Sequence, residues 1–206
     1  GDQEVDIVHM VSKITKESIL IEDPNTIAEV INRAFLKSIS GRQGPVWIDI
    51  PIDVQAATIN KDIIKLINKP LKIEKANSLT ISDEIINKIA NKLVVSKRPV
   101  LYVGNGIRLS NSYKEFIKFL ENFPIATVTG WNSNDLIWDS HPCYCGRPGS
   151  VGNRAGNFAV QYSDCVIIIG SRLNIRQVSF NWKSFAKNAW TCHIDIDKDE
   201  LDKPTL

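Results

Sequence analysis

The chain has 206 residues, of which 43% are hydrophobic and 23% are charged. These fractions are close to the averages of globular domains, which argues against a disordered chain or a coiled coil. The 25 basic and 23 acidic residues are interspersed and give a net charge of +2, so no nucleic-acid partner is expected. No apolar run approaches the roughly 18 residues of a membrane span, and the first residues do not resemble a signal peptide, so we expect a cytoplasmic protein without a membrane partner.

The cysteines point to a reducing compartment. Cys143, Cys145, Cys165 and Cys192 follow no disulfide spacing, and the last two lie in apolar runs, where a free thiol acts as a small hydrophobe. The C-x-C pair of Cys143 and Cys145 lacks the second half of a closed zinc site. No metal site is therefore expected in this chain.

The first part of the chain predicts one αβ unit. Asp23 and Pro24 predict a helix start, after which apolar residues recur at helical spacing. This helix is predicted to stop at Gly41 and to be followed by a strand over residues 46–50. The chain opens without a methionine inside a periodic segment and stops directly after a strand-like run. We therefore expect a piece of a longer protein.

Residues 54–81 keep no periodicity and contain Pro70. A stretch of this length without structure is unusual inside a compact domain, so it predicts a connector between two units. Residues 1–53 would then be the remnant of one α/β domain, and residues 82–206 a second domain.

Helical and strand patterns alternate four times after the connector. The predicted strands are 99–103, 124–128, 165–169 and 191–196, and a helical pattern precedes each of the first three. Such alternation predicts an α/β fold in which a parallel sheet carries helices on both faces. The strands are apolar without alternation, which is typical of strands buried on both faces.

Ligands of open parallel sheets bind at the carboxyl ends of the strands. The residues there are Gly104-Asn105-Gly106, Thr127-Val128-Thr129-Gly130, Gly170-Ser171-Arg172 and Asp195-Ile196-Asp197. Glycine allows a ligand to approach the backbone closely, and a carboxylate can accept hydrogen bonds from a ribose. Together these residues predict a nucleotide-binding slot. Residues 104–106 lack the full G-x-G-x-x-G pattern, so a plain tight turn remains an equal interpretation of them.

A second candidate segment is residues 146–154, in which Gly146, Gly149 and Gly152 precede a predicted helix. Glycines in this position would supply unpaired backbone N–H groups, which suit an anion. The alternative is a mobile surface loop.

A third candidate follows the strand at 165–169. Arg172, Asn174 and Arg176 alternate there and would point the same way if the chain stays extended, with a solvated basic edge as the alternative. The chain has no G-x-S-x-G or H-E-x-x-H motif and only three histidines. No self-contained catalytic site is therefore expected.

One segment is specific to a family. Residues 41–55 read Gly-Arg-Gln-Gly-Pro-Val-Trp-Ile-Asp-Ile-Pro-Ile-Asp-Val-Gln. This resembles the G-R-P-G-P-V-x-I-D-I-P-x-D-V-Q segment that ends the pyrimidine-binding domain of thiamine-diphosphate enzymes of the acetolactate synthase type. Residues 3–8 and 14–16 are similar to the F-Q-E-V-D and I-T-K stretches of that family. The later glycine turns and residues 193–197 resemble its middle domain.

The resemblance implies that residues 1–53 are the C-terminal part of the pyrimidine-binding domain and residues 82–206 the middle domain, a Rossmann-like fold of the DHS type. The family's activating Glu and its G-D-G…N-N motif fall outside this chain, so the resemblance implies a segment that is inactive alone. Its partners would be the missing pyrimidine- and pyrophosphate-binding domains of the same protein, in a homodimer or homotetramer. Thiamine diphosphate and Mg²⁺ would serve the whole enzyme, a 2-keto acid decarboxylase or carboligase.

Acetolactate synthases bind FAD, which takes no redox part in the main reaction, in the middle domain. The resemblance and the strand ends place twelve residues around FAD or another adenine nucleotide: Arg42, Gly104, Gly106, Thr127, Gly146, Arg147, Gly170, Arg172, Asn174, Arg176, Asp195 and Ile196. Arginine suits diphosphate oxygens as a bidentate donor, and Asp195 suits a ribose or an adenine-side contact.

Several residues depart from the family pattern. Asn105, Pro148 and Asn174 replace usual residues of the nucleotide site, and Asp2 stands where a Phe of the substrate pocket is usual. The substrates therefore stay open, as do the roles of Gln3 and Lys16, which resemble residues near the active-site entrance. Two other interpretations remain: a structural module with a vestigial slot that spaces the catalytic domains, and a free-standing dinucleotide enzyme of sirtuin-like fold.

Overall fold

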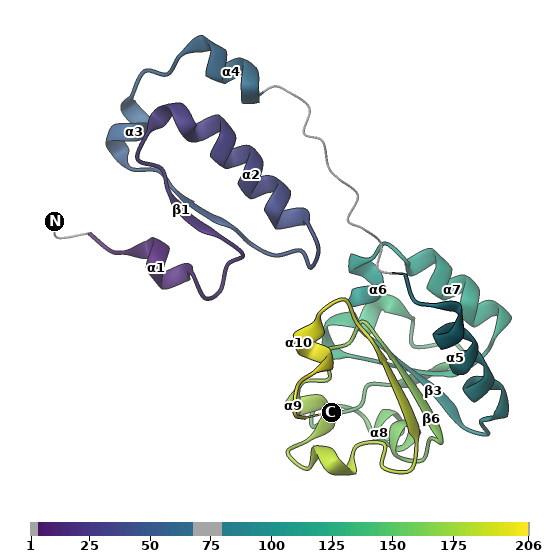
Figure 1. Cartoon of the computed structure of the whole chain (residues 1–206). Helices are drawn as coiled ribbons and strands as arrows, with labels where there is room; N and C mark the ends of the chain where they lie inside the picture. The colour runs from purple at the N-terminus through teal and green to yellow at the C-terminus, as the bar shows by residue number, and fades with distance from the viewer. Residues whose placement is uncertain (1–3, 68–79, 206) are drawn as a thin grey trace. The chain divides into compact units, whose positions relative to one another are not determined.

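The computed structural model describes residues 4–67 and 80–205. The chain divides into two compact units, Gly1–Ser78 and Leu79–Leu206 (Figure 1). Within the described ranges, no helix combines the length and the apolar character that crossing a membrane requires.

The first unit is a small αβ layer. Strands β1 (Ser18–Leu20) and β2 (Trp47–Asp49) pair in parallel, with Ile19 opposite Ile48. A 3-10 turn, η1 (Pro24–Thr26), leads into helix α2 (Ile27–Ile39). The Asp23 carboxylate accepts a hydrogen bond from the Asn25 amide at 2.9 Å, so the helix start predicted at Asp23 and Pro24 is confirmed. The unit also contains α1 (Ile7–Val11), α3 (Ile52–Ala56) and α4 (Lys61–Ile67).

The prediction of a connector over residues 54–81 was wrong for its first part. Helix α3 covers the start of this stretch, and α4 follows within it and packs against α2. These helices have five and seven residues, which is too short for a helical period to stand out in the windows of 11 to 18 residues that such patterns need. Residues 68–79 lie outside the described part.

The second unit is built on a parallel sheet of five strands in the order β5-β4-β3-β6-β7. The strands are β3 (Pro99–Val103), β4 (Ala126–Thr129), β5 (Tyr144–Gly146), β6 (Cys165–Ile169) and β7 (Trp190–Ile194). The predicted α/β fold with a parallel sheet is confirmed. Strand β5 was not predicted, because three residues that include Cys145 and Gly146 carry no strand pattern.

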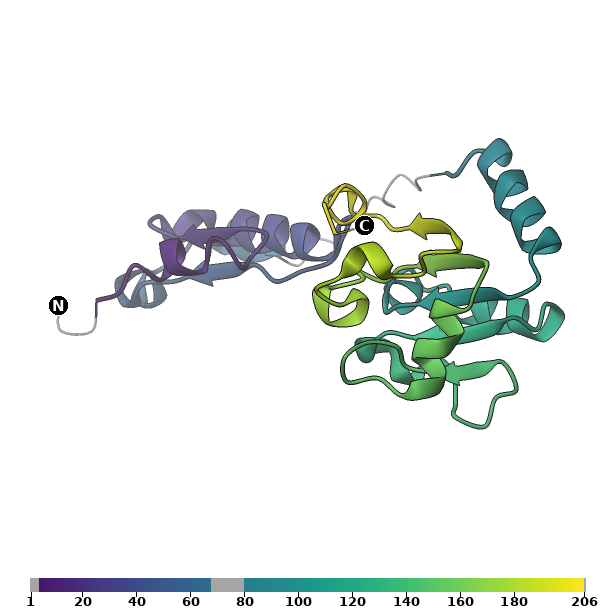
Figure 2. The same ribbon diagram turned by 90° about the horizontal axis from the view of Figure 1, so that it is seen from below.

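Helices cover both faces of this sheet, as predicted (Figure 2). On one face Leu101 and Val103 pack with residues of α5, α6 and α7; on the other face Val100 and Tyr102 pack with residues of α8 and α9. Successive strand residues point to opposite faces, so strands that are apolar throughout supply both cores. The elements are α5 (Asp83–Val95), α6 (Gly106–Leu109), α7 (Tyr113–Asn122), η2 (Trp131–Leu136), α8 (Arg154–Gln161), α9 (Ile175–Val178), η3 (Trp182–Ser184) and α10 (Lys198–Leu201).

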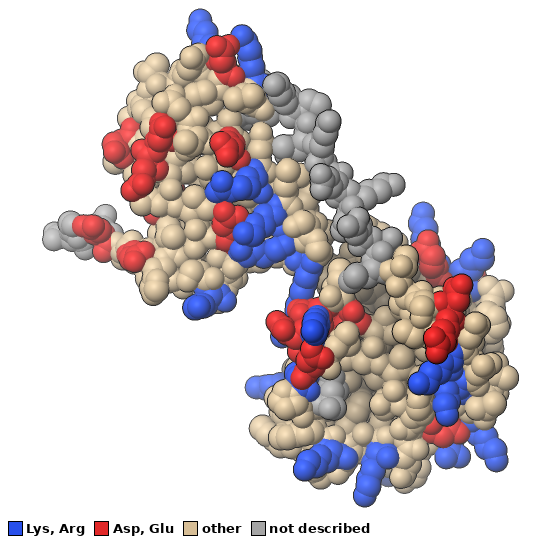
Figure 3. Space-filling view, in the orientation of Figure 1, with Lys and Arg blue, Asp and Glu red and all other residues tan. Residues whose placement is uncertain are grey.

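The strands are parallel, so their carboxyl ends lie at one edge of the sheet. We call this edge the rim; it consists of residues 104–106, 130–133, 147–153, 170–174 and 195–197. On the face of the second unit visible in Figure 3, basic and acidic side chains are interspersed. Any preference of the rim for a charged ligand must therefore come from particular side chains rather than from the charge of the whole surface.

Candidate functional site

The glycines at the ends of β3 and β6 contact each other. Gly104 donates its N–H to the Ile169 carbonyl, and Gly106 donates to the Gly170 carbonyl, both at 2.9 Å. A β-carbon on Gly104 would lie 2.2 Å from the Gly170 oxygen, and one on Gly106 would lie 2.5 Å from the Gly170 α-carbon. Glycine is therefore required where two backbone turns touch. Protein backbone therefore occupies the side of Gly104 and Gly106 on which a β-carbon would project, and a ligand beside these two residues stays a prediction.

Thr127 lies inside β4 and not at its end. It pairs with Leu101, is fully buried, and donates its hydroxyl to the Ile125 carbonyl at 2.9 Å. The strand was predicted at 124–128 and lies at Ala126–Thr129, so its carboxyl end comes one residue later than predicted and Thr127 is an interior residue. The last residue of β4 is Thr129, and Gly130 directly after it is the first rim residue of this segment.

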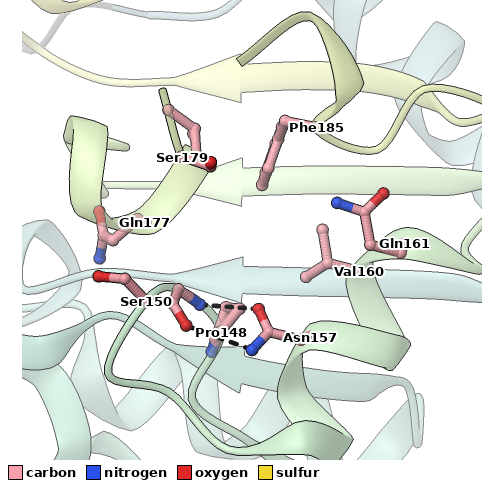
Figure 4. A pocket seen from close by; sticks show the side chains of 10 residues that line it. Pro148, Ser150, Asn157, Val160, Gln161, Gln177, Ser179 and Phe185 are labelled. Atoms are coloured by element: carbon pink, nitrogen blue, oxygen red, sulfur yellow. Dashed lines mark hydrogen bonds between the residues drawn. The ribbon is translucent and has the colours of Figure 1, made fainter. Parts of the chain in front are cut away.

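The backbone N–H groups of the loop from Gly146 to Asn153 donate hydrogen bonds to side-chain and backbone oxygens of the protein. The Asn153 carboxamide oxygen accepts from the Arg147 amide at 3.3 Å, and the Asn157 oxygen accepts from the Gly149 amide at 2.9 Å (Figure 4). Asn157 also donates to the Gly149 carbonyl at 3.2 Å. The amides of Ser150, Gly152 and Asn153 bond to the carbonyls of Arg176, Gly149 and Arg147. The prediction of unpaired N–H groups is therefore wrong for these five residues.

The stretch from Arg172 to Arg176 does not stay extended. Leu173 has a φ of +44°, and Asn174 then begins helix α9 with a capping box. The Asn174 oxygen accepts from the Arg176 amide at 3.0 Å, while the Gln177 oxygen accepts from the Asn174 amide at 3.1 Å. The expectation of three side chains alternating along a strand is corrected, because the Asn174 side chain caps a helix that carries Arg176.

Arg172 is paired with a buried carboxylate. Its Nε donates to Glu200 of α10, whose second carboxylate oxygen accepts from Lys203 at 3.0 Å. The side chain of Arg172 is 65% exposed, while that of Glu200 is only 8% exposed. Burial raises the pKa of Glu200, but hydrogen bonds from Lys203 and Arg172 lower it more, and the net pKa lies below the ordinary value. Glu200 is therefore an anion that holds two cations at the rim.

The end of β7 supplies Asp195 and Ile196, as predicted from the strand pattern. Asp195 is half-buried and accepts from the Asp197 amide at 3.0 Å, whereas Ile196 is exposed. A side chain of β7 also contacts the turn that follows β6, because His193 Nε2 lies 2.8 Å from the Ser171 carbonyl oxygen.

Four buried polar side chains, none of them among the twelve predicted site residues, lie around Gly130. A β-carbon on Gly130 would lie 2.9 Å from Gln177 Nε2, 3.3 Å from Ser133 Oγ and 3.7 Å from Ser171 Oγ. Thr129, which precedes Gly130, is fully buried, and its hydroxyl has no hydrogen-bond partner within the described residues. Ser171 and Thr129 could have been found from their places after β6 and in β4; Gln177 could not, since a helix turn carries it there.

A small pocket opens next to this cluster. Its volume is about 210 Å³, below the roughly 300 Å³ that bounds typical small-molecule sites. Figure 4 shows Ser150 and Gln177 facing each other across one end, with Val160 and Phe185 at the other. The pocket is lined by neutral polar groups and apolar side chains, so it suits an uncharged part of a ligand.

Two of the remaining candidates, Arg42 and Lys16, belong to the first unit. Arg42 belongs to the first unit, where it is exposed between α2 and β2. Lys16 lies in the same unit and donates to the carbonyls of Lys37 and Ser40 at 2.6 Å each, so it caps the carboxyl end of α2. Gln3 lies outside the described residues. The four cysteines are free thiols.

Comparison with known proteins defines the class. Residues 86–205 match the family described as thiamine pyrophosphate enzyme, central domain. The match covers more than half of the chain, and the chain therefore belongs to this family.

The relatives narrow this class. The chain is 34% identical over 201 residues to the acetolactate synthase isozyme 1 large subunit of Escherichia coli K12, covering 98% of this chain and 34% of the relative. It is 36% identical over 204 residues to the acetolactate synthase large subunit of Corynebacterium glutamicum, covering 98% and 32%. The chain thus spans about a third of the length of the curated relatives it matches, and the expected resemblance to enzymes of the acetolactate synthase type is confirmed.

Proposed function

We propose that this chain is the central segment of a thiamine-diphosphate-dependent enzyme that decarboxylates and ligates 2-keto acids, as acetolactate synthases do. The observation that carries the proposal is the similarity of 98% of the chain to acetolactate synthase large subunits. Thiamine diphosphate supplies carbanion stabilisation in such chemistry. Domains beyond this chain would hold it with Mg²⁺, and the whole protein would be a cytoplasmic homodimer or homotetramer.

Within this enzyme the rim of the second unit binds FAD or another adenine nucleotide. The side-chain chemistry fits such a ligand. Arg172 at the rim and Arg176 on the following helix α9 are exposed cations, and arginine binds diphosphate oxygens through paired donors.

The loop amides contribute less to this site than the sequence predicted. Five amides between Arg147 and Asn153 are bonded within the protein, so they are not available to a diphosphate. The negative charge would therefore be neutralised mainly by arginine side chains. Asp195 would bind a ribose hydroxyl, and exposed Ile196 would contact the adenine side.

Two experiments test the two parts of the proposal. The whole gene product, supplied with thiamine diphosphate and Mg²⁺, is expected to release CO₂ from a 2-keto acid; no release from any of a panel of 2-keto acids would contradict the enzyme assignment. The 206-residue chain is expected to take up FAD, seen as visible flavin absorbance retained after gel filtration, or to gain thermal stability with ADP. If the chain shows no FAD uptake and no thermal shift with ADP, the nucleotide site is contradicted and the structural-module interpretation is favoured.

A further inference from the structure

The guanidinium of Arg172 is held from one side by the C-terminal helix. Glu200 on α10 accepts a hydrogen bond from its Nε, and this carboxylate is nine-tenths buried while the arginine side chain is 65% exposed. The hydrogen bond to Glu200 thus uses the Nε–H donor of Arg172, on the side of the guanidinium that faces the protein. The outer part of the guanidinium faces solvent at the rim.

Lys203 completes this contact. Its Nζ lies 3.0 Å from the second oxygen of Glu200 and also donates to the backbone carbonyl of Arg172. The Lys203 side chain is itself only 19% exposed. Both carboxylate oxygens of Glu200 are therefore occupied by cations, and one backbone group of Arg172 is held in addition to its side chain. Within this group of three side chains, two cations surround one anion.

Ser171, which precedes Arg172, is also bound through its backbone carbonyl. His193 Nε2 lies 2.8 Å from the Ser171 carbonyl, so two consecutive carbonyls, of Ser171 and Arg172, are bound by side chains of β7 and of the segment after α10. The next residue, Leu173, is fully buried with a φ of +44°, a conformation that leucine adopts only when its surroundings hold it. The turn after β6 is thus fixed by contacts from the last part of the chain.

We infer that Glu200 and Lys203 are positioning residues that fix Arg172 by its Nε and its carbonyl so that its Nη donors meet a phosphate of the bound nucleotide. The inference rests on the proposed nucleotide function and adds the residues that give its arginine a defined position. An arginine that is already fixed loses little side-chain entropy when a phosphate binds, which strengthens binding. Without Glu200 the side chain would have to be ordered by the ligand itself.

The test compares ADP with adenosine on the 206-residue chain, because only ADP carries the phosphates. We expect Glu200→Gln to weaken ADP binding by about tenfold, the effect of one charge-assisted hydrogen bond, and to change adenosine binding by less than about twofold. The matched control is Asp202→Asn at the carboxyl end of the same helix, where the Asp202 side chain is 66% exposed and its carboxylate lies 4.0 Å from Lys198. This control is expected to change neither affinity.

The second measurement is a double-mutant cycle. In an Arg172→Lys background, Glu200→Gln should no longer alter the ratio of the two affinities, since the guanidinium fork is gone. A merely structural role of Glu200 would lower both affinities in both backgrounds and would overturn the inference. If Glu200→Gln fails to fold, Lys203→Met provides the same comparison, and Glu200→Asp should restore part of the ADP preference.

The outcomes separate the inference from the proposed function. If the unmodified chain binds ADP and Glu200→Gln binds it equally well, the positioning role is refuted and the nucleotide site stands. If the unmodified chain binds neither ADP nor FAD, the nucleotide site and the positioning role both fall.

Discussion

His193 Nε2 lies 2.8 Å from the carbonyl oxygen of Ser171. A carbonyl oxygen only accepts hydrogen bonds, so Nε2 carries the proton of the neutral ring. The other ring nitrogen, Nδ1, is buried and has no hydrogen-bond partner among the residues that the structure describes. Protonation of His193 would therefore place a new N–H group where nothing described accepts it.

The first prediction concerns pH. Burial lowers the pKa of His193 below its ordinary value, and this outweighs the opposing hydrogen bond to Ser171 and the nearby Asp195 charge. The unfolded chain takes up the proton near pH 6.5 and the folded chain only at lower pH, so the free energy of unfolding should fall as the pH drops below about 6.5. Urea unfolding between about pH 7.5 and pH 5.5 measures this.

The matched variant for this prediction is His193→Gln, whose amide can still donate to the Ser171 carbonyl but does not titrate. Its free energy of unfolding should change less over this pH range than that of the unmodified chain. Equal slopes for the two proteins would show that His193 is not responsible.

The second prediction concerns Glu200 in acid. Its net pKa is lowered in the folded protein, so its contribution to stability is complete above the pKa of an unfolded glutamate, about 4.3, and is lost as the pH falls through the folded value. The difference in unfolding free energy between the unmodified chain and Glu200→Gln should therefore be largest near neutral pH and shrink below about pH 4.3. A difference that stays constant down to acid unfolding would contradict this.

The third prediction concerns the contact of β3 and β6. Gly104→Ala would place a methyl group 2.2 Å from the Gly170 carbonyl oxygen, and the atom it meets is backbone. We expect a loss of about 2 kcal/mol or more in the free energy of unfolding, measured by urea denaturation.

The control for this glycine is Gly44→Ala. A β-carbon there would meet only the flexible side chain of Lys16, at 3.2 Å. Its effect should stay within about 0.5 kcal/mol. A tolerated alanine at Gly104 would mean that the two turns separate more easily than their hydrogen bonds indicate.

The fourth prediction concerns the loop after β5. Asn157→Ala removes the two hydrogen bonds to the Gly149 amide and carbonyl, which should cost about 1 to 3 kcal/mol and speed hydrogen exchange of the Gly149 amide. Asn122→Ala on α7 removes one exposed hydrogen bond to Lys118 and should change stability by less than about 0.5 kcal/mol. Unchanged exchange at Gly149 would refute the anchoring role.

The sequence predicted the fold better than the site. Apolar runs such as Cys165–Ile169 identified four strands and the two-faced sheet, because burial on both sides leaves a strong local pattern. Boundaries were weaker. The carboxyl end of β4 lies one residue later than predicted, so Thr127, which was expected at the strand end, lies inside the strand.

The site depends on contacts between distant residues, which local patterns do not contain. From the sequence, Gly104 was expected to allow a ligand close to the backbone. The structure shows that the backbone of Gly170 lies where a β-carbon of residue 104 would project. The pairing of Arg172 with Glu200 joins residues 28 positions apart, and no periodicity indicates it. The side chains of Asn153 and Asn157 bond to amides of the preceding loop, and no local sequence pattern indicates these contacts.

The loop from Gly146 to Asn153 has a fixed backbone conformation without a ligand, because five of its amides are hydrogen-bonded within the protein. A ligand that binds this loop therefore requires no rearrangement of its backbone, and its association rate should be limited by diffusional encounter. Outward side chains on this loop, such as Arg147 and Ser150, can then be exchanged one at a time to alter which molecule is preferred while the scaffold beneath them is unchanged.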